Sequence, residues 1–393
     1  MGGSTVVVLG GGWGGLTAAH HLRGLLSAEH RVVVVERNDT FSFCPSYLWL
    51  MTGERETRDV SRPMAKLARP GIEWVHDEVR AFDPTTRSVT TGSGELAGDH
   101  VIIALGTENA PSEVPGFVEA AHNVYDAEGA VAARRALSDF EGGGIVVLVA
   151  RTPYRCPGAP NEAAFLIDSF FRGRGIRDRV EIALYTPEKQ PLGVAGPAVG
   201  AAILEMFTER GISYHAQRTV RRIDGASRTI TFDEEAVPYD LLIGIPPHRA
   251  PAAIRESGLI DGTGYVPVHP QSLELLADPE TLETRHAGVY AIGDVTSIRL
   301  LNSLLLPKTG VFAEGEAVVV AENVAATIQG KRASASYKGI GGCYVEVGGG
   351  MAAYGVGNFF AYPGPQLTLE PPSAEQRRAK EQFEKVLVNW FRG

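Results

Sequence analysis

The order of elements in the first 36 residues constrains the fold more than any other feature of the sequence. Residues 5–9 form a run rich in β-branched residues, typical of a short buried strand, and the glycine-rich turn 10–15 follows directly. A helical pattern covers 16–26, and 31–35 is expected to be the next buried strand, which ends at Glu36. This order predicts a right-handed βαβ unit with parallel strands.

The turn within this unit has the spacing of a dinucleotide-binding site. It reads Gly10-x-Gly12-x-x-Gly15, and Glu36 lies 21 residues beyond Gly15. The glycines would allow backbone N–H groups to approach a pyrophosphate at the helix N-terminus, and Glu36 would accept hydrogen bonds from ribose hydroxyls. We place Arg37, next to Glu36, in the same cofactor-binding set. The alternative is a glycine-rich turn that binds no ligand.

Alternating strand and helix patterns continue along the chain and predict a doubly wound α/β architecture. Further strands are expected at 101–105, 145–149, 180–185, 240–245 and 288–292, and helices at 127–139, 161–173, 197–210 and 310–328. A second dinucleotide-type unit begins at 142–149, which predicts two Rossmann-like dinucleotide-binding domains. The expected division is a first domain at 1–112 and 266–330, an inserted second domain at 113–265, and a C-terminal tail at 331–393.

Composition narrows the class of protein. A length of 393 residues suits two or three domains, and a net charge of −9 argues against a nucleic-acid partner. No apolar run approaches the roughly 18 residues of a membrane span, and no basic region or cleavage site precedes the first strand, so neither a transmembrane helix nor a cleaved signal peptide is expected. The three cysteines, Cys44, Cys156 and Cys343, have no metal-site spacing, and no metal is expected.

Two further strand ends carry residues suited to a flavin nucleotide. Gly106 lies in the turn of the segment 101–107, and Asp294 ends the segment 288–294. Ligands of open α/β sheets lie beyond the carboxyl ends of strands, so Asp294 could hold a ribityl hydroxyl. Lys308 precedes a long helix, and its ammonium group would stabilise negative charge on a reduced flavin. Taken alone, Asp294 could instead be an N-cap and Lys308 a solvated lysine.

The glycine motif and the segments 101–107 and 288–294, in this order, carry a resemblance that covers nearly the whole chain. They resemble the two-dinucleotide-domain flavoprotein reductases related to disulfide reductases. The resemblance implies a glutathione-reductase-like fold that binds FAD.

The second domain departs from that pattern. A reductase that uses NAD(P)H should repeat GxGxxG after the strand at 145–149, but residues 150–162 read Ala-Arg-Thr-Pro-Tyr-Arg-Cys-Pro-Gly-Ala-Pro-Asn-Glu. The bulky Pro, Arg and Tyr residues would hinder a pyrophosphate, and a cysteine has appeared. With Lys308-Thr-Gly-Val-Phe-Ala-Glu-Gly and the closing Pro371-Pro-Ser…Lys385…Trp390, the chain is similar to the sulfide:quinone oxidoreductase and flavocytochrome c sulfide dehydrogenase group.

In that group two cysteines form a redox-active disulfide at the flavin, and Cys156 and Cys343 are the matching positions. The helix that follows Cys156 would favour its thiolate. The resemblance implies that sulfide attacks the disulfide and leaves a persulfide on one cysteine, while the freed thiolate, Cys343, passes electrons to the flavin. Glu162 could accept a proton beside Cys156. Each cysteine could instead be a small buried hydrophobe, and Glu162 a first-turn helix carboxylate.

Cys44 follows Glu36 at a spacing that the resemblance connects with covalent attachment of the flavin. In flavocytochrome c sulfide dehydrogenases a cysteine at this spacing is joined to the flavin 8α-methyl group. Cys44 is therefore a candidate for covalent attachment of FAD, with a plain buried thiol as the alternative.

The C-terminal segment 375–391 has apolar residues at helical spacing and basic residues beside them. This pattern predicts a helix that lies on a membrane surface, with Trp390 and Phe391 as anchors. The same stripe could pack against the protein's own core or against a second subunit of a homo-oligomer. Separately, three aromatic residues could line an apolar slot for a quinone ring, namely Tyr344, Phe359 and Phe360.

These predictions lead to one hypothesis and three alternatives. The leading hypothesis is a peripheral membrane flavoenzyme, on an undetermined membrane face, that oxidises sulfide to polysulfide or sulfur and reduces a quinone. The first alternative passes electrons to a c-type cytochrome partner, since the chain itself has no C-x-x-C-H. The second is an NADH:quinone reductase, and the third is a flavin-binding redox sensor or scaffold without turnover.

Overall fold

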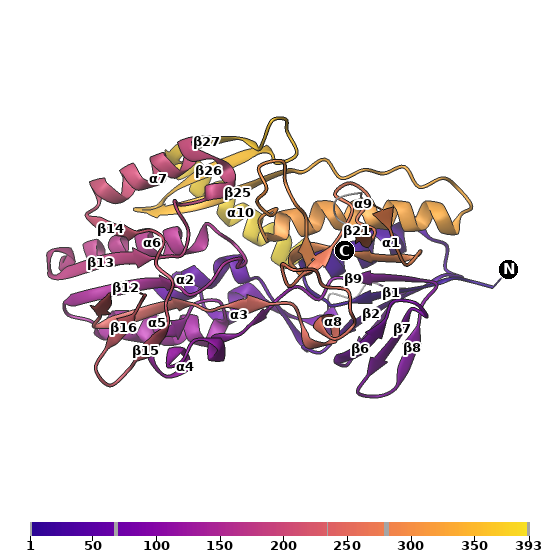
Figure 1. Ribbon diagram of the computed structural model, residues 1–393, viewed down its shortest axis with the longest axis horizontal. Coiled ribbons are helices and arrows are strands. Elements are labelled where there is room, and N and C mark those ends of the chain that lie inside the picture. The colour runs from indigo at the N-terminus through magenta and orange to yellow at the C-terminus, as the bar shows by residue number, and fades with distance from the viewer. Residues whose placement is uncertain (1, 67–69, 234, 279–282, 391–393) are drawn as a thin grey trace.

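Two parallel sheets, one in each half of the molecule, form the framework of the computed structural model (Figure 1). The structure describes residues 2–66, 70–233, 235–278 and 283–390. Alternation of strands and helices around these sheets confirms the predicted α/β class.

The first sheet has five parallel strands in the order β23-β9-β1-β2-β5. Their bounds are β1 (Thr5–Leu9), β2 (Arg31–Glu36), β5 (Ile72–His76), β9 (His100–Ile103) and β23 (Val289–Ala291). Central β1 is buried along almost its whole length, as expected for a strand with neighbours on both sides and covered faces. The helices α1 (Trp13–Leu25) and α9 (Gly310–Ile328) pack against each other beside this sheet.

The strand order places a ligand-binding crevice. The chain runs outward from β1 to β2 and β5 on one side, and returns on the other side with β9 and β23. At such a switch point the connections leave in opposite directions, and the space beyond the carboxyl ends of the strands stays open. The ends of β1 and β9 are therefore where a ligand of this sheet would lie.

The second sheet repeats the design with five parallel strands in the order β11-β18-β12-β13-β14. The strands are β11 (His122–Asn123), β12 (Gly143–Val149), β13 (Val180–Tyr185), β14 (Ile212–His215) and β18 (Leu241–Ile245). The helices of this half are α5 (Ala127–Asp139), α6 (Ala159–Gly173) and α7 (Pro197–Glu209). Helix α6 begins two residues before the prediction, because Pro160 is well suited to a first helical turn.

Small antiparallel sheets and short elements complete both halves. The two three-stranded sheets contain β6 (Val79–Asp83), β7 (Ser88–Thr91) and β8 (Glu95–Ala97), and β15 (Arg222–Asp224), β16 (Thr229–Thr231) and β17 (Ala236–Pro238). The short helices are α2 (Tyr47–Thr52), α3 (Thr57–Val60), α4 (Phe117–Ala120) and α8 (Ala252–Arg255). The short strands are β3 (Thr40–Ser42), β4 (Ser61–Pro63), β10 (Glu108–Asn109), β19 (His248–Arg249), β20 (Val266–Pro267), β21 (Leu276–Asp278), β22 (Glu283–Thr284) and β24 (Thr296–Ser297).

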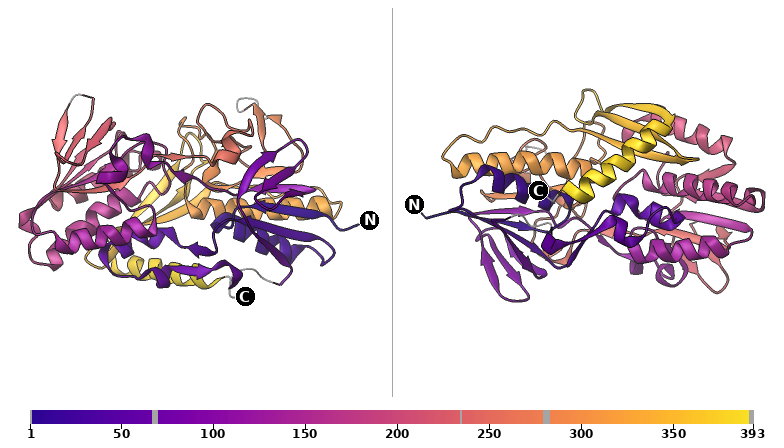
Figure 2. Two further views of the ribbon diagram at one scale, coloured as in Figure 1. Left: turned by 90° about the horizontal axis from the view of Figure 1, so that it is seen from below. Right: turned by 180° about the vertical axis from the view of Figure 1, so that it is seen from behind.

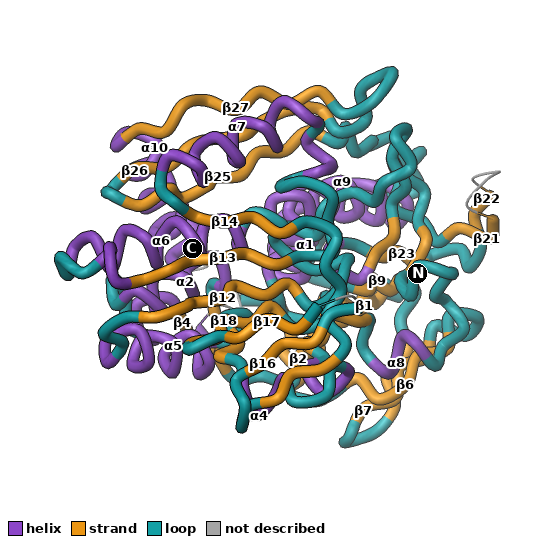
Figure 3. The backbone as a smooth tube through the Cα atoms, turned by 60° about the vertical axis from the view of Figure 1, so that its left-hand side comes forward, coloured by secondary structure: helices purple, strands orange, loops and turns teal. Residues whose placement is uncertain are grey.

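The C-terminal segment forms a third layer. The strands β25 (Ile340–Gly348), β26 (Met351–Asn358) and β27 (Gln366–Ser373) make an antiparallel sheet beside the second half, where β25 packs on α6 (Figure 3). The last helix, α10 (Ala374–Trp390), crosses the junction of the two halves, as the right-hand view of Figure 2 shows. Within the described ranges, no helix combines the length and apolarity needed to cross a bilayer. The domain boundaries at 112, 265 and 330 stay predictions.

Candidate active site

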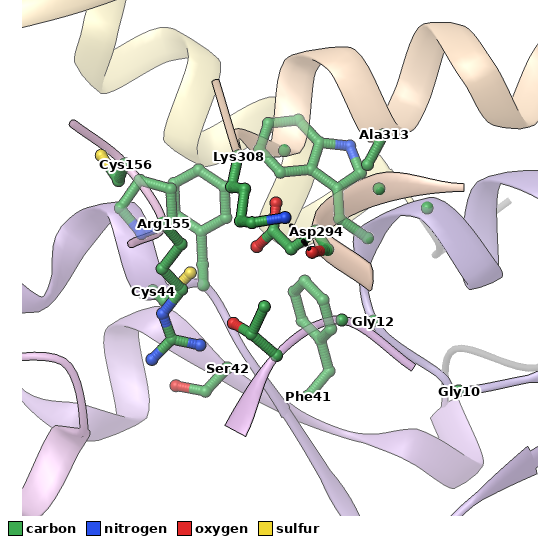
Figure 4. A pocket seen from close by; sticks show the side chains of 18 of the residues that line it. Gly10, Gly12, Phe41, Ser42, Cys44, Arg155, Cys156, Asp294, Lys308 and Ala313 are labelled. Carbon is green, nitrogen blue, oxygen red and sulfur yellow. Dashed lines mark hydrogen bonds between the residues drawn. The ribbon is translucent and has the colours of Figure 1, made fainter. Parts of the chain in front are cut away.

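A cavity of about 1050 Å³ lies beyond the carboxyl ends of β1, β2 and β9. Its walls come from all three parts of the chain: the glycine turn of the first half, the segment around Cys156 and Glu162 in the second, and residues of β25 and α10. Figure 4 shows labelled residues of the first half, among them Cys44, Asp294 and Lys308, around the same space as Arg155 and Cys156 of the second half. The cavity therefore occupies the switch point that the strand order predicts.

The glycines of the first turn have separate roles. Gly10 has a φ of +103°, and its N–H donates to the carbonyl of Val35 at 2.8 Å. A Cβ on Gly15 would lie 1.9 Å from the carbonyl oxygen of Gly10, so Gly15 permits α1 to pack against the turn and does not itself line the cavity. A Cβ on Gly12 would meet no atom within 4 Å, which leaves the N-terminus of α1 open to the cavity.

Glu36 lies at the end of β2 and fixes this turn. Its Oε2 accepts a hydrogen bond from the N–H of Gly11 at 2.7 Å, and its Oε1 accepts from the backbone N–H of Asn38 at 2.8 Å. Arg37 also lines the cavity and pairs with Glu78 at 3.0 Å. Carboxylate oxygens can accept further bonds, so Glu36 remains able to receive ribose hydroxyls.

Asp294 and Lys308 line the opposite wall. The Oδ1 atom of Asp294 is buried without a hydrogen-bond partner among the described residues, and burial raises the pKa of this carboxyl. The ammonium group of Lys308 donates to the carbonyls of Asp294 at 2.7 Å and Thr296 at 2.9 Å, and burial lowers its pKa to about 8. Gly106, with a φ of +63°, also lines this cavity.

These walls fit FAD. An unpartnered buried carboxylate oxygen is costly unless a ligand hydroxyl satisfies it, and Asp294 supplies such an atom inside the cavity. The glycine turn offers backbone N–H groups at a helix N-terminus, where a pyrophosphate is favoured. The sequence-predicted residues that line the cavity and could hold the cofactor are Gly10, Gly12, Glu36, Arg37, Cys44, Gly106, Asp294 and Lys308.

The two cysteines from distant segments meet in the cavity wall. Cys156 precedes α6 in the left-handed conformation, with a φ of +52°, and its N–H donates to the carbonyl of Lys308 at 2.7 Å. Its thiol hydrogen-bonds with that of Cys343, from β25. This bond raises the pKa of Cys156 well above its usual value and lowers the pKa of Cys343. Both are free thiols, and Cys343 is exposed to the cavity.

Glu162 lies behind the pair in the first turn of α6. It is 3% exposed, and its Oε2 accepts hydrogen bonds from the ammonium of Lys380 at 2.6 Å and from the N–H of Glu346 at 3.1 Å. Lys380 belongs to α10 and Glu346 to β25. The negative charge of Glu162 raises the pKa of Cys156, after the thiol hydrogen bond and burial.

Cys44 lines the same cavity from a short turn after β3. Burial raises the pKa of its thiol, and the guanidinium of Arg155 beside it partly opposes this (Figure 4). Arg155 in turn donates to the carbonyl of Tyr125 and to Oδ1 of Asn109 at 3.4 Å. The guanidinium of Arg155, the residue before Cys156, is thus held beside Cys44.

The three aromatic residues of the predicted quinone slot separate in the structure. Tyr344 lines the cavity. Phe359 instead packs edge-on against Phe312 in the first core, with centroids 4.8 Å apart, and Phe360 packs against Tyr337 at 5.6 Å. Neither Phe359 nor Phe360 lines the cavity, because the end of β26 turns both rings into the packing around α9.

Sequence reasoning missed a second aromatic group in the cavity wall. The rings of Trp13, Phe43 and Phe383 lie 5.4–6.1 Å from one another, and Tyr344 lies 6.1 Å from Phe383. All four line the cavity. Trp13 stands inside the glycine motif, and an aromatic residue at this position was a signal that sequence reasoning left unused.

The helix at the C-terminus buries charged residues, although the sequence predicted basic residues beside a buried or membrane-facing apolar stripe. Arg377, Lys380 and Glu384 are 5–7% exposed, and partly buried Phe383 shares their face. The signal was a lysine at 380, in register with the apolar positions at 383 and 387. Of the predicted anchors, Phe391 lies outside the described residues, as does the side chain of Trp390.

In the second half, the turn that follows β12 is filled by side chains of the described residues. Its strand β12 ends at Val149, and the following loop inserts Tyr154, which is 3% exposed. The hydroxyl of Tyr154 donates to Oε2 of Glu188 at 2.7 Å. Glu188 follows β13 as Glu36 ends β2, and here this carboxylate is bonded to the tyrosine that fills the turn.

Comparisons with known proteins place these features in a family. The profile of the family described as pyridine nucleotide-disulphide oxidoreductase matches residues 4–323. The mitochondrial sulfide:quinone oxidoreductase of Mus musculus is 26% identical over 357 residues, which cover 87% of this chain and 75% of that protein. The alternative NAD(P)H-ubiquinone oxidoreductase C1 of Arabidopsis thaliana is 28% identical over 364 residues, covering 83% and 68%. The X-ray structure of the Aquifex aeolicus sulfide:quinone oxidoreductase matches 99% of this chain and 91% of that chain, with a TM-score of 0.86 and 24% identity.

Proposed function

Because this chain belongs to the pyridine nucleotide-disulphide oxidoreductase family, we propose that it is an FAD-dependent enzyme that oxidises sulfide to polysulfide or sulfur and reduces a quinone. The observation that carries the proposal is the contact between the thiols of Cys156 and Cys343 inside the cavity that fits FAD. A relative named sulfide:quinone oxidoreductase, aligned over 87% of the chain, supports it.

The cysteine pair, once oxidised to a disulfide, is the proposed sulfide acceptor. Hydrosulfide attacks the sulfur of Cys156, so that a new S–S bond forms there, the Cys156–Cys343 bond breaks, and Cys343 leaves as a thiolate. The direction follows from the lowered pKa of Cys343, since the thiol of lower pKa leaves faster. The hydrosulfide proton passes to a base, and the carboxylate of Glu162 in the cavity wall is the proposed acceptor.

FAD supplies the two-electron acceptor that connects the cysteine pair to the quinone. In this proposal the residues named in the fit above hold the cofactor, and Asp294 receives the ribityl chain. The aromatic group of Trp13, Phe43, Tyr344 and Phe383 supports a quinone ring at the apolar end of the cavity.

The sealed second turn argues against the NADH:quinone reductase alternative. Tyr154 and the bulky loop around it fill the place where a nicotinamide nucleotide would be bound, and Glu188 is engaged by Tyr154. The Arabidopsis relative shows that the family includes proteins named for NAD(P)H oxidation, so direct comparison of the two reductants is decisive.

The test is to mix purified flavin-bound protein with sulfide and separately with NADH, without oxygen, and record the visible flavin absorbance. Rapid bleaching by sulfide and none by NADH is expected. Bleaching by NADH alone would overturn the proposal. Adding either a short-chain quinone or a c-type cytochrome to the sulfide-reduced protein then identifies the acceptor, with faster reoxidation by the quinone expected.

We also propose that the Cys44 sulfur is bonded to FAD. Cys44 lines the cofactor cavity within the electrostatic reach of Asp294 and Arg155, which supports the attachment. Acid precipitation is the measurement: a yellow pellet is expected from the wild type and a colourless pellet from Cys44→Ala. A colourless wild-type pellet would exclude the covalent link and leave the sulfide proposal intact.

Membrane contact is proposed to be peripheral and to involve the outer face of α10. Arg378, Lys385 and Val386 are exposed there, and Val386 is 48% exposed. Sedimentation with anionic vesicles should carry the protein down, and more weakly at high salt.

A further inference from the structure

The inner face of α10 brings a connected set of charges to the cysteine pair. Buried charges persist only when they are paired, so their partners reveal what the helix holds. Glu384 accepts hydrogen bonds from Ser46 at 2.7 Å and from Arg55 at 2.9 Å, both in the first half. Arg377 pairs with Glu346 of β25 at 3.2 Å. The helix is therefore held by ion pairs on both sides of the cavity.

Lys380 and Glu384 both line the cavity, and Lys380 is the member of this set that contacts the carboxylates beside the cysteine pair. Its ammonium group lies 2.6 Å from Oε2 of Glu162 and 3.6 Å from Oε1 of Glu346, so one cation bridges two carboxylates from α6 and β25. It also lies 5.1 Å from the ring centre of Trp49. Burial lowers the pKa of Lys380, but the two carboxylates outweigh it, and the net pKa is raised. Lys380 therefore stays charged.

Cys343 shares the cavity with this cation. It precedes Glu346 by three positions on β25, and it lines the cavity together with Lys380 and Glu162. After the hydrogen bond from Cys156 and the opposing effects of burial and Glu162, the charge of Lys380 contributes to lowering the pKa of Cys343. The reciprocal effect is present too, since Cys343 contributes to raising the pKa of Lys380.

We infer that Lys380 is a positioning residue whose ammonium group keeps the negative charge of the reduced cysteine pair on the sulfur of Cys343 and leaves the shared proton on Cys156. The inference deepens the proposed function and rests on its reactive cysteine pair. Without this cation, Cys343 would face the carboxylate of Glu162 uncompensated, and like charges in a buried site disfavour ionisation. Lys380 thus selects which sulfur leaves as thiolate and which one sulfide attacks.

The other groups that face Cys343 do not duplicate this role. They are Cys156, Glu162, Tyr344 and Tyr354. Burial raises the pKa of both tyrosines, so they stay neutral in the range where the thiols titrate. Among these described neighbours of Cys343, Lys380 is therefore the group that carries a positive charge.

The test is the pH dependence of cysteine alkylation in the reduced, flavin-bound enzyme. Iodoacetamide reacts with the thiolate, and peptide mass spectrometry reports Cys343 and Cys156 separately. In Lys380→Met the midpoint for Cys343 is expected to rise by about one unit, which makes alkylation about tenfold slower below the midpoint. Lys380→Arg keeps the charge and should stay within about twofold of the wild type.

Lys338→Met is the matched control, because Lys338 lies exposed just before β25, the strand that carries Cys343. Its Cys343 midpoint should match that of the wild type. An unchanged midpoint in Lys380→Met, or a Lys380→Arg variant as slow as Lys380→Met, overturns the inference.

A second variant decides the matter if Lys380→Met does not hold FAD. Glu346→Gln removes a carboxylate that competes for the ammonium group, so Cys343 should be alkylated faster at a given pH. An equal or slower rate contradicts the inference. Because alkylation requires neither sulfide nor quinone, failure here is distinguishable from failure of the proposed function, which the flavin spectra test.

Discussion

The two parallel sheets each place a strand-to-helix turn at the same point, and the turns differ in what fills them. After β1, the turn 10–15 is built from glycines and opens into a large cavity. After β12, residues 150–158 insert Tyr154 against Glu188 and place Cys156 at the rim of that same cavity. The framework fixes where a ligand can lie, and the side chains of the turn decide whether space remains for it. One turn is suited to a cofactor, and the other supplies a reactive sulfur instead.

The largest expected effect comes from removing the sulfur that the second turn contributes. Cys156→Ser should slow flavin bleaching by sulfide on the order of 10³-fold, because loss of a nucleophile or acceptor atom removes the whole reaction path. Stopped-flow absorbance measures it, and Cys343→Ser should fall equally. If both variants kept the wild-type rate of flavin bleaching by sulfide, the second turn would not supply a reactive sulfur.

Filling the space beneath the first turn should weaken cofactor binding. In Gly15→Val the Cβ would lie 1.9 Å from the carbonyl oxygen of Gly10, so α1 and the turn must separate. Such overpacking costs about 1–3 kcal/mol, which corresponds to roughly 5- to 150-fold weaker FAD binding. The flavin-to-protein absorbance ratio after dialysis reports the loss. An equal change at Gly24, where a Cβ meets no atom within 4 Å, is the control, and identical ratios would contradict the packing role.

Glu316 is expected to make the stability of the first half depend on pH. It lies beneath the first turn's cavity, 1% exposed, and accepts a hydrogen bond from the N–H of Gly293 at 2.6 Å. Burial raises its pKa from 4.5 to about 8. A carboxyl whose folded-state pKa is raised stabilises the fold below its ordinary pKa, and this contribution is lost as pH rises through the raised value.

The unfolding free energy should therefore decline between pH 4.5 and about 8 by on the order of a few kcal/mol. In Glu316→Gln this part of the decline should disappear. Urea unfolding across that pH range tests it, and an equally steep decline in the variant would contradict the assignment.

The smallest effect on sulfide oxidation is expected from changing Tyr154, which only fills the second turn. Tyr154→Phe leaves the partly buried Glu188 without one hydrogen bond and should lower the unfolding free energy by about 1–3 kcal/mol. Sulfide oxidation should change little, because Cys156 keeps its backbone bond to Lys308. Thermal unfolding and the sulfide assay together check this. A loss of sulfide activity larger than the loss of stability would show that the tyrosine does more than fill space.

Local sequence was sufficient for the first turn and insufficient for the wall opposite it. The glycine spacing, Glu36 and the strand end at Asp294 follow from backbone rules that act over short distances. The pairing of Glu162 with Lys380 joins residues 218 positions apart, and no local rule connects them. The pairing of Cys156 with Cys343 entered through the resemblance and not through spacing.

The terminal helix α10 also shows that local sequence does not determine tertiary contacts. Its periodicity predicted a helix correctly, but a stripe of apolar positions does not state what covers it. Here the covered face contains Lys380 and Glu384, whose partners are set by tertiary packing. Phe359 lies in the core and not in the cavity wall for the same reason, since the end of β26 determines where its ring packs.

Peptide mapping without reductant tests the central claim most directly. Oxidised enzyme should yield one linked peptide joining Cys156 to Cys343, and a single addition of sulfide should convert it into a Cys156 peptide heavier by one sulfur atom and a free Cys343 peptide. Unlinked peptides that gain no sulfur, in protein whose flavin is still bleached by sulfide, would contradict the account.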